Sequence, residues 1–350
     1  MKRVLVISKY GIQNPSYRYR IDLFTKDLEN KEISFTYLIN QDTPRENILK
    51  RLLYKLRLVI SSEIVLIHRF YEFHILLFVL IFGKPIIYDL DDAIFIIRQN
   101  QFYEKEGLIK KYYREYIRGS EHYSSQKRKT DLIVLLSKKI IFGNKYLSDF
   151  YSKYKFKTII VPTSVSLPEV IKEHNEKDEI IIGWTGVTAN TVYLNMLEEV
   201  FEELNIISTK KLKLKIVSGD SKYISKYIDT ENIKWSLEGE SETVMSFDIG
   251  IMPLHDDPFS RGKCAFKAIF FMSLGIPVVV SPVGANCELI ENGFNGFLAK
   301  TNEEWVYYLR MLINDFELRK RTGENARNTI EKAYSKNANI GKIFNVIREL

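Results

Sequence analysis

Three cations in one short stretch carry the strongest chemical signal in the sequence. Arg261 and Lys263 flank Gly262, and Lys267 follows four residues after Lys263. Glycine allows a tight turn, and the apolar run that begins at Ala265 predicts a helix directly after that turn. The amides and the dipole of a helix N-terminus favour an anion. We therefore expect Lys263 and Lys267 to project from one helical face and to hold a diphosphate, with a solvated basic face as the alternative.

A buried strand and a second loop are predicted after this helix. Gly275–Pro277 ends the helix, and Val278–Val280 is a short apolar run of the kind found in buried parallel strands. Ser281–Gly284 then forms a loop at the carboxyl end of that strand. Ligands of open parallel sheets bind in the crevice beyond such strand ends. The loop is therefore a second candidate for ligand contact.

Apolar β-rich runs alternate with helical patterns along the chain, which predicts an α/β fold with parallel sheets. The polar, aperiodic segment 167–178 is the predicted linker between a first domain, 1–166, and a second domain, 179–335. Residues 336–350 have the apolar spacing of a helix that packs onto another surface. The expected strands are Val4–Ser8, Phe35–Ile39, Ile64–His68, Pro85–Leu90, Leu132–Leu136, Thr158–Val161, Ile180–Trp184, Leu212–Val217, Ile233–Leu237, Asp248–Pro253 and Val278–Val280.

Two sets of motifs resemble family 4 glycosyltransferases, which have the GT-B fold. In the donor-binding half of that family, a small-residue helix, GxPVV, a glycine loop with a glutamate and NGxNGxL follow in the order found from residue 265 to residue 298. In the first half of the chain, Ser16–Arg20 resembles the Ser-x-Arg-x-Arg motif of one branch, and Gly143–Leu147 resembles its GNxYL segment. The resemblance implies two Rossmann-like domains that face each other across a cleft, with the C-terminal helix 336–350 crossing back onto the first domain.

The resemblance also assigns roles to particular residues. The reaction that it implies needs cations near a departing nucleoside diphosphate, and we expect Lys263 and Lys267 to supply them. It also implies that Asp91, at the position of a family histidine, contacts the donor sugar as a catalytic residue. No metal and no other cofactor is expected. The expected donor-binding residues are Gly186, Arg261, Gly284, Ala285, Asn286 and Glu288, and the expected acceptor or phosphate contacts are Arg18, Arg20 and His255.

Simpler interpretations of some of these residues stay open. Arg18 and Arg20, expected on a loop between the first strand and the next helix, could instead pair with acids such as Asp22 or Asp92. Asp89 and Asp92 could cap the end of their strand or pair with the same arginines. His255 follows a predicted strand and could hydrogen-bond locally rather than act as an acid or base.

The chain departs from the family pattern at two places. Most family members carry two glutamates separated by seven residues, and the matching positions here are Gly262 and Phe270. The arginine and lysine expected after the Gly183-Trp184 strand are also absent, with Val187 and Thr191 in their neighbourhood. We infer that the cations facing the diphosphate have moved to the segment that contains Lys263 and Lys267, since a leaving group needs nearby positive charge from any source.

Length and composition indicate a folded protein with room for two α/β domains. The chain has 350 residues, of which 45% are hydrophobic and 27% charged. A net charge of +7 favours an acidic partner, such as phosphorylated ligands or an anionic membrane, and no nucleic-acid-binding motif is present. Cys264 and Cys287 lack the spacing of a zinc site or a disulfide framework, which favours the cytoplasm. No apolar run is long enough to span a bilayer.

A basic amphipathic helix is predicted from Arg45 to Ser62. Its apolar residues fall on one face, with lysines and arginines elsewhere. Such a helix can lie on an anionic bilayer, or its apolar side can cover the first sheet. We expect core packing with a basic rim. The predicted apolar face consists of Ile48, Leu49, Leu52, Leu53 and Leu56.

These observations together favour a retaining glycosyltransferase that moves a sugar from a nucleotide-diphosphate sugar, with uridine as the expected base, to a glycan or lipid-linked acceptor in cell-surface polysaccharide assembly. A location in the cytoplasm, with peripheral contact to the inner membrane face, would suit a lipid-linked acceptor. Two alternatives stay open. The first is a sugar-nucleotide epimerase of the same fold, and the second is a non-catalytic subunit that binds a sugar nucleotide.

Overall fold

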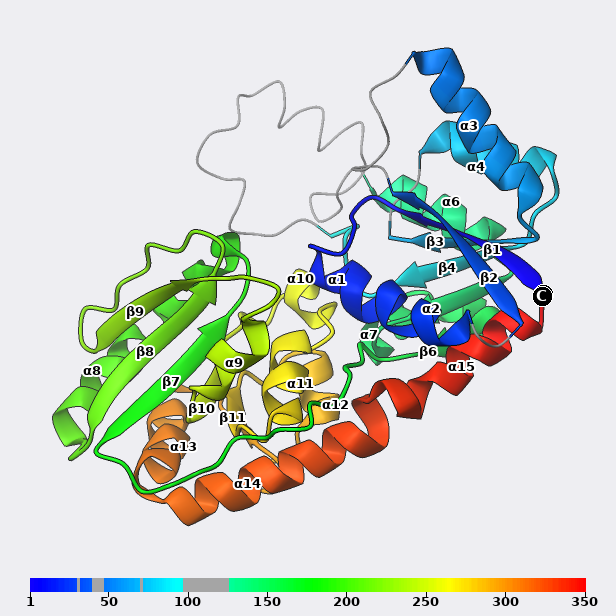
Figure 1. Ribbon diagram of the computed structural model, residues 1–350. Helices are drawn as coiled ribbons and strands as arrows, with labels where there is room; N and C mark the ends of the chain where they lie inside the picture. The colour runs from blue at the N-terminus through cyan, green and yellow to red at the C-terminus, as the bar shows by residue number, and fades with distance from the viewer. Residues whose placement is uncertain (30–31, 40–46, 70–71, 97–125) are drawn as a thin grey trace, which may run out of the picture. The chain divides into compact units, whose positions relative to one another are not determined.

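The computed structural model describes residues 1–29, 32–39, 47–69, 72–96 and 126–350 (Figure 1). Within these residues the chain forms two compact units, each built on a parallel sheet of six strands. The predicted α/β fold class with two parallel sheets is therefore confirmed. Unit 1 consists of Met1–Thr163, Asp257–Cys264 and Asn339–Leu350, and unit 2 consists of Ser164–Asp256 and Ala265–Ala338.

The sheet of unit 1 has the strand order β2-β1-β3-β4-β5-β6, with all neighbours parallel. Because the chain winds outward in both directions from β1 and β3, the carboxyl ends of β3 and β4 lie near the change in winding direction, where α/β sheets place their ligands. The strands are β1 Lys2–Ser8, β2 Ile33–Ile39, β3 Ile64–His68, β4 Ile86–Leu90, β5 Lys139–Phe142 and β6 Thr158–Ile160.

Helices cover both faces of this sheet. One face packs against α3, α4 and α6, whose buried residues share a core with β3, β4 and β5. The other face packs against α2 and the C-terminal helix α15, through side chains such as Phe24 and Ile343. The helices of unit 1 are α1 Pro15–Tyr17, α2 Leu23–Leu28, α3 Ile48–Ser61, α4 Phe73–Ile81, α6 Lys127–Leu136, α7 Lys145–Phe150 and α10 Pro258–Arg261, with α15 Lys336–Arg348 entering from unit 2.

Two expectations for unit 1 are wrong. Leu132–Leu136 is not a strand but the end of α6, and the strand that follows, β5, was not predicted. A short apolar run cannot be assigned to a helix or a strand by its periodicity alone. The second error concerns α3: its predicted inner residues Leu49 and Leu53 are exposed, whereas Lys55 is buried. Arg45, the first residue of that predicted helix, lies outside the described residues.

The sheet of unit 2 has the strand order β12-β11-β10-β7-β8-β9, again with all neighbours parallel. The strand predicted at Ile233–Leu237 lies earlier, as β9, because the paired residues run from Asp229 to Lys234. The strands are β7 Glu179–Thr185, β8 Lys211–Ser218, β9 Asp229–Lys234, β10 Ile249–Met252, β11 Val278–Val280 and β12 Phe297–Leu298.

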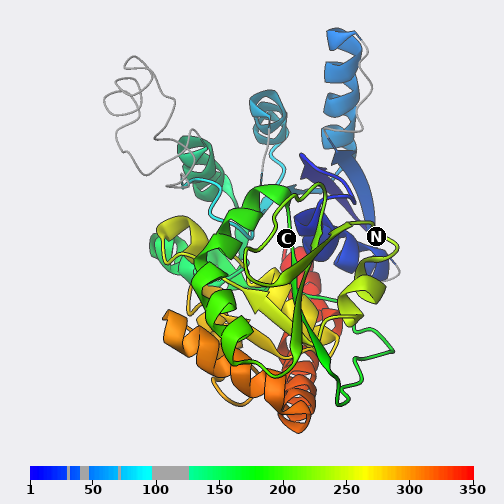
Figure 2. The same ribbon diagram turned by 90° about the vertical axis from the view of Figure 1, so that its left-hand side faces the viewer.

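The helices of unit 2 also form two layers. On one face α8 and α13 lie side by side (Figure 2) and share a core with β7, β8 and β10. On the other, α11 packs along β10 and β11, with Phe271 against Phe247. The helices are α8 Glu198–Ile207, α9 Glu240–Met245, α11 Phe266–Ser273, α12 Ala285–Leu289, α13 Asn302–Asn314 and α14 Phe316–Thr329.

The predicted linker has no helix or strand, but it is tightly held within unit 2. Lys172 and Lys177 both pair with Asp248, at 3.1 and 2.8 Å, at the start of β10. His174 is buried and its Nε2 lies 3.0 Å from the carbonyl oxygen of Gly275. Because these two lysines are paired and His174 is buried, we do not expect this segment to behave as a flexible tether.

Candidate functional site

The carboxyl end of β7 in unit 2 brings together an indole, a glycine and a lysine. The Lys267 ammonium lies over the Trp184 ring, 4.3 Å from its centroid. A Cβ atom added to Gly186 would lie only 2.8 Å from Lys267 Cε and 2.9 Å from Trp184 Cη2, so this close approach requires glycine. The first turn of α11 thus carries a cation to the strand end where the expected arginine and lysine are absent. An aromatic face holds such a cation in place without neutralising its charge.

Lys263 and Lys267 do not share a helical face, so that expectation is wrong. Helix α11 begins at Phe266, and its N-cap residue Ala265 has φ of 53°. A non-glycine residue in this left-handed region breaks the helical path, which leaves Lys263 before the helix. Lys263 instead lies over the ring of Phe259, with its ammonium 5.1 Å from the centroid. The two lysines therefore reach their positions independently.

The loop after β11 presents fewer amides than predicted. Gly284 has φ of 55° and precedes α12. The N–H of Asn286 already donates to the carbonyl oxygen of Val283 at 3.2 Å, so this amide is not the available donor that we expected. The Asn286 side chain is buried and donates to Ser281, which fixes the loop from within. The remaining predicted residues, Ala285 and Glu288, are half-buried and exposed respectively.

His255 lies exposed beyond β10, at the same strand edge of unit 2 as Lys267. Its ring is 5.7 Å from that of Tyr193, at an angle of 53°. Tyr193 belongs to the 3₁₀ segment Thr188–Leu197 that follows β7. The strand edge of unit 2 therefore carries aromatic rings beside cationic or titratable groups.

The residues from Asp257 to Cys264, which we expected in the second domain, belong to unit 1. A Cβ atom on Gly262 would lie 3.1 Å from the backbone nitrogen of Ala93. Asn144 Nδ2 donates to the carbonyl oxygens of Gly262 and Lys263, at 2.9 and 3.1 Å. The Cys264 thiol donates to the carbonyl oxygen of Asp91 at 2.6 Å. These bonds fix the segment, and Arg261 within it is exposed.

Both glutamate positions of the family pattern are closed to a carboxylate. At Gly262 a side chain would collide with Ala93. At the other position, Phe270 is buried in unit 2, and its ring stacks on Phe266 at 5.9 Å. The acidic pair is therefore replaced by backbone packing at one position and by an aromatic core residue at the other.

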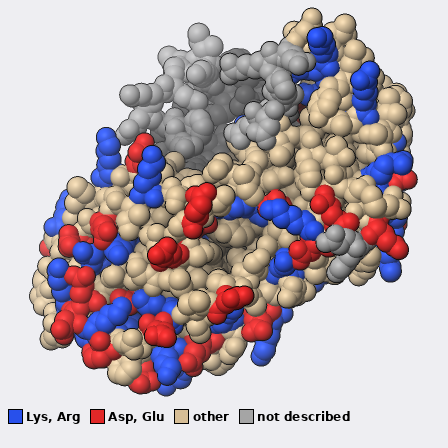
Figure 3. Space-filling model, in the orientation of Figure 1, with Lys and Arg blue, Asp and Glu red and all other residues tan. Residues whose placement is uncertain are grey.

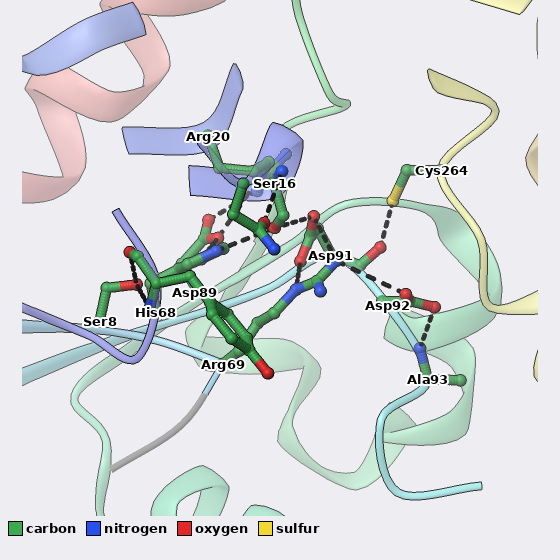
Figure 4. Close-up of polar contacts among 12 residues, drawn as sticks. Ser8, Ser16, Arg20, His68, Arg69, Asp89, Asp91, Asp92, Ala93 and Cys264 are labelled. Atoms are coloured by element: carbon green, nitrogen blue, oxygen red, sulfur yellow. Dashed lines mark hydrogen bonds and ion pairs between the residues drawn. The ribbon is translucent and has the colours of Figure 1, made fainter. Parts of the chain in front are cut away.

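In unit 1, buried charges gather at the carboxyl ends of β3 and β4 (Figure 4). Arg20 is 2% exposed and donates to both carboxylate oxygens of Asp89, at 3.2 and 2.6 Å, and also to the carbonyl oxygen of Val161. His68 Nδ1 lies 2.9 Å from Asp89 Oδ1. Arg20 lies within a π-helical turn, Arg18–Asp22, and not on a loop as expected. It pairs with Asp89, which is one of the simpler interpretations that the sequence left open.

Asp91 is held from two sides. The Arg69 guanidinium binds both of its carboxylate oxygens, and the Ser16 hydroxyl donates to Asp91 Oδ2 at 2.6 Å. Arg69 has φ of 60°, and its backbone is fixed by hydrogen bonds with Asp89 and with the Tyr88 hydroxyl. Such a strained conformation persists only where its surroundings hold it. Asp91 is therefore a fixed, charged element of the strand end.

The hydrogen bonds also indicate which atoms of this cluster carry hydrogen. Ser16 Oγ lies 2.9 Å from His68 Nε2, which resembles the serine and histidine of a hydrolase. Ser16 already donates its proton to Asp91, however, so His68 Nε2 must donate to Ser16, while Nδ1 donates to Asp89. Both ring nitrogens then carry hydrogen. The serine is an acceptor from His68 and a donor to Asp91, and no base is left to activate it.

The pKa values follow from these pairs. Burial alone would raise the pKa of Asp89, but Arg20 and His68 outweigh it and hold that pKa below its usual range. Burial would likewise raise the pKa of Asp91, but Arg69 and His68 outweigh burial and hold this pKa well below its usual range. Burial together with Asp91 raises the pKa of the Cys264 thiol, so it stays a hydrogen-bond donor and not a nucleophile.

His68, Asp89 and Asp91 also bring three potential metal-ligand atoms within 4.8 Å of one another. Oxygen ligands of this kind suit magnesium or manganese. Here each carboxylate already faces a guanidinium, at 2.6 Å for Asp89 and in a bidentate pair for Asp91. A metal ion would have to displace these arginines. The donor set therefore fits an internal charge network better than a metal centre.

Trp184 and Ser16 had no role of their own in the sequence analysis, and Arg69 was expected only at a strand end that lines the acceptor side. Arg69 follows β3 and Trp184 lies in β7, and both are cationic or aromatic residues at the carboxyl end of a parallel strand. Ser16, inside the Ser-x-Arg-x-Arg motif, links His68 to Asp91. The signal that could have found them is their position at strand ends, because parallel strands bring these ends to one edge.

Comparisons with known proteins agree with this architecture. Residues 168–329 match the family described as glycosyl transferases group 1, which is a little under half of the chain. No curated protein sequence matches the chain. Three solved structures have similar folds over nearly their whole length. HepE of Anabaena, in complex with UDP-glucose, aligns with a TM-score of 0.68 at 13% identity, over 100% of both chains. Sucrose-phosphate synthase of Thermosynechococcus elongatus aligns with a TM-score of 0.66 at 12% sequence identity, over 100% of this chain and 99% of that one. The lipopolysaccharide outer core galactosyltransferase WaaB aligns with a TM-score of 0.65 at 13% sequence identity, also over 100% of this chain and 99% of that one.

Proposed function

We propose that this chain, whose residues 168–329 match the glycosyl transferases group 1, transfers a sugar from a nucleotide-diphosphate sugar to a glycan or lipid-linked acceptor. The observation that carries the proposal is the Lys267 ammonium at the carboxyl end of β7, 4.3 Å from the centre of the Trp184 ring. It lies in the matched segment and at a strand end of the kind where α/β sheets bind their ligands. It also supplies positive charge where the expected arginine and lysine are absent.

The chemistry requires such a cation. Glycosyl transfer passes through a state in which positive charge develops on the sugar and negative charge on the departing nucleoside diphosphate. A preorganised ammonium near the diphosphate stabilises that charge. In this proposal Lys267 is the main leaving-group contact, and Lys263 and Arg261 add cations from the preceding segment. The amides of Gly284 and Ala285 contribute hydrogen bonds, and Glu288 fixes the loop or binds a sugar hydroxyl.

Uridine diphosphate is the proposed donor nucleotide, and retention of the anomeric configuration is the proposed outcome. The similar HepE structure contains UDP-glucose, which supports the choice of nucleotide. We propose that no metal ion takes part, since the described cations of the site supply the counter-charge themselves. Asp91 is then a positioning residue that acts through Ser16 and Arg69, and His255 and Arg18 are candidate acceptor contacts. Two free cysteines suit the proposed cytoplasmic location.

One observation favours a second candidate, a non-catalytic subunit that binds a sugar nucleotide. Both glutamate positions of the family pattern are closed, by the packing of Gly262 on Ala93 and by the buried ring of Phe270. A protein without these sugar contacts could bind a nucleotide and leave the sugar unreacted. Turnover separates this candidate from the transferase, and an altered sugar in the product would instead indicate an epimerase.

The test is a calorimetric titration with UDP, GDP, ADP and their sugar conjugates, followed by an assay of nucleotide release. Wild-type protein is compared with Lys267→Ala and with Lys320→Ala, which removes an exposed lysine from α14. We expect selective binding of UDP and its conjugates that is lost in Lys267→Ala and kept in Lys320→Ala. Binding without turnover under any acceptor condition would support the non-catalytic subunit. No binding of any nucleotide would overturn the proposal.

A further inference from the structure

Helices α3 and α4 of unit 1 expose about half of their large apolar side chains. Of the twenty-four exposed large hydrophobic side chains in the described part of the chain, ten lie between residues 48 and 82. Phe73 is 67% exposed, Ile81 65% and Leu49 63%. A typical monomer does not collect its exposed apolar residues in this way, and such a patch marks an interaction surface.

The exposed residues of α3 form a stripe next to basic side chains. Leu49, Leu53 and Ile60 follow one another at spacings of four and seven residues, so they lie along one side of the helix. Lys50 and Arg57 lie beside this stripe and are exposed as well. The opposite side of α3 faces the core through Val59 and Lys55.

Helix α4 repeats the apolar pattern without any charge. Phe73, Leu77 and Ile81 follow at spacings of four, with Leu80 beside them, and all four are exposed. The opposite side, Ile75, Leu76 and Val79, is buried in the core of unit 1. Helix α4 is thus apolar on its outer and inner sides alike. A helix exposed to water on one side normally carries polar residues there.

An ion pair holds the stripe of α3 outward. The Lys55 side chain is 2% exposed, and its ammonium donates to Glu72 Oε2, at the start of α4, at 2.5 Å. His74 lies 2.9 Å from the same oxygen. Burying a lysine is costly unless it is paired, and the Glu72 carboxylate offsets this cost for Lys55. Rotating α3 to bury Leu53 would break that pair.

The charged residues within the two helical segments are all basic. The sequence has no aspartate or glutamate between residues 47 and 62 or between residues 73 and 88. Of the three glutamates next to these segments, Glu63 pairs with Arg3 and Glu72 with Lys55, and Glu46 lies outside the described residues. Figure 3 shows basic side chains among uncharged atoms over α3. The surface therefore combines exposed apolar side chains with an excess of positive charge.

We propose that the exposed sides of α3 and α4 form a docking surface for an anionic lipid bilayer. The apolar stripes enter the boundary between headgroups and acyl chains, and Lys50 and Arg57 bind the headgroup phosphates. A second copy of the chain fits less well, because two such surfaces would bring lysines and arginines of like charge together. No described helix is long and apolar enough to cross a membrane, so the contact is peripheral. The proposal does not depend on the proposed sugar transfer.

The experiment is co-sedimentation with phosphatidylcholine vesicles that do or do not contain phosphatidylglycerol, at low and at high salt and without any nucleotide. One variant, Leu53→Glu with Leu77→Glu, changes one exposed residue on each stripe. A second, Lys50→Glu with Arg57→Glu, reverses the charges. The matched control, Ile206→Glu with Ile224→Glu, changes residues of unit 2 that are 77% and 73% exposed.

We expect the wild type to bind the anionic vesicles at low salt and to release them at high salt. Each α3–α4 variant should lose about tenfold in vesicle binding, because each new charge disfavours a lipid contact, and the unit 2 control should bind like the wild type. Thermal melting of all variants confirms that they are folded. Absence of binding to anionic vesicles at low salt would overturn the proposal, as would unchanged binding by the Leu53→Glu, Leu77→Glu variant. A dimer in analytical ultracentrifugation that this variant dissociates would identify a second copy as the occupant instead.

Discussion

At the carboxyl ends of β3 and β4 in unit 1, buried acids and bases pair with one another, whereas the end of β7 in unit 2 carries a lysine against an indole ring. The first region joins Arg20 to Asp89 and Arg69 to Asp91. In the second, Lys267 faces Trp184 and Gly186. An aromatic ring orients a cation without cancelling its charge, whereas a carboxylate cancels it. We infer that the first region holds the strand ends, whereas in the proposed function the second region meets the anionic diphosphate.

The largest expected effect tests the structural role of the first region. Asp89→Asn leaves Arg20 and His68 buried without their counter-charge, and removing one partner of a buried pair costs about 3–5 kcal/mol. We expect the free energy of unfolding, measured in urea, to fall by that amount. The control is Asp149→Asn, whose carboxylate is 59% exposed and pairs with Lys145, and it should change stability by less than about 0.5 kcal/mol. Equal effects of the two variants would contradict a structural role for the cluster.

The next effect tests the second region. Under the proposed function, Lys267→Ala should lower kcat/KM by a factor equivalent to about 2–4 kcal/mol, because it removes a preorganised charge near the leaving group. We expect a loss of the same size for Lys263→Ala, whose lysine lies in the 257–264 segment of unit 1. Steady-state kinetics with a UDP-sugar donor measures the loss, and urea unfolding should show little change for either variant. If Lys267→Ala has normal kinetics in a normally folded protein, the comparison between the two regions fails.

The pH dependence of stability tests His174, which lies in the 167–178 segment and belongs to neither region. Burial lowers the pKa of His174 to about 4, while an unfolded histidine has a pKa of about 6.5. Between these pH values the unfolded chain binds more protons than the folded chain. Lowering the pH from about 6.5 to about 4 should therefore reduce the free energy of unfolding by about 3 kcal/mol. The lowered pKa of Asp89 acts in the same direction, but only below the ordinary value of 3.8.

The measurement is urea unfolding between pH 4 and pH 7. His174→Gln should flatten the slope in this window, while His255→Gln, at an exposed position, is the matched control. A slope that persists in His174→Gln would mean that another group carries the pH dependence.

The smallest expected effect concerns the close approach at β7. Gly186→Ala would place a methyl group 2.8 Å from Lys267 Cε, and so it should displace the ammonium. Small displacements of catalytic groups lower rates by about 10- to 100-fold. Gly219→Ala is the control, because its methyl group would meet only Thr188 Oγ1, at 3.8 Å. Equal kcat/KM values for both variants would show that the position of Lys267 is not critical.

The sequence predicted most of the sheet frame but less of the contacts at its edges. Val4–Ser8 and Ile64–His68 are recognisable as strands because buried parallel strands are continuous apolar runs. Leu132–Leu136 has the same composition but ends a helix, and local pattern cannot distinguish the two. The end of β7 was predicted to within one residue, at Trp184 instead of Thr185.

The contacts between distant residues could not be predicted in the same way. The sequence allowed Asp89 to pair with Arg18 or Arg20 but could not select the pair, because that depends on which helix turns toward which strand, and 69 residues separate Arg20 from Asp89. The break at Ala265 was also unpredictable, since an alanine gives no sign of a positive φ. On α3, the choice between burying Leu53 and burying Lys55 depends on Glu72, a residue from another helix. Tertiary pairing decided that choice, against the helical pattern.

The discontinuous path of unit 1 has a consequence for building chimeras of this protein. Because Asp257–Cys264 belongs to unit 1, a graft of a foreign second half at the 167–178 segment would import a foreign 257–264 segment. That segment would have to fit against Ala93 without a side chain at position 262, and accept bonds from Asn144. A workable exchange of unit 2 therefore has to leave residues 257–264 in place and be spliced on both sides of them.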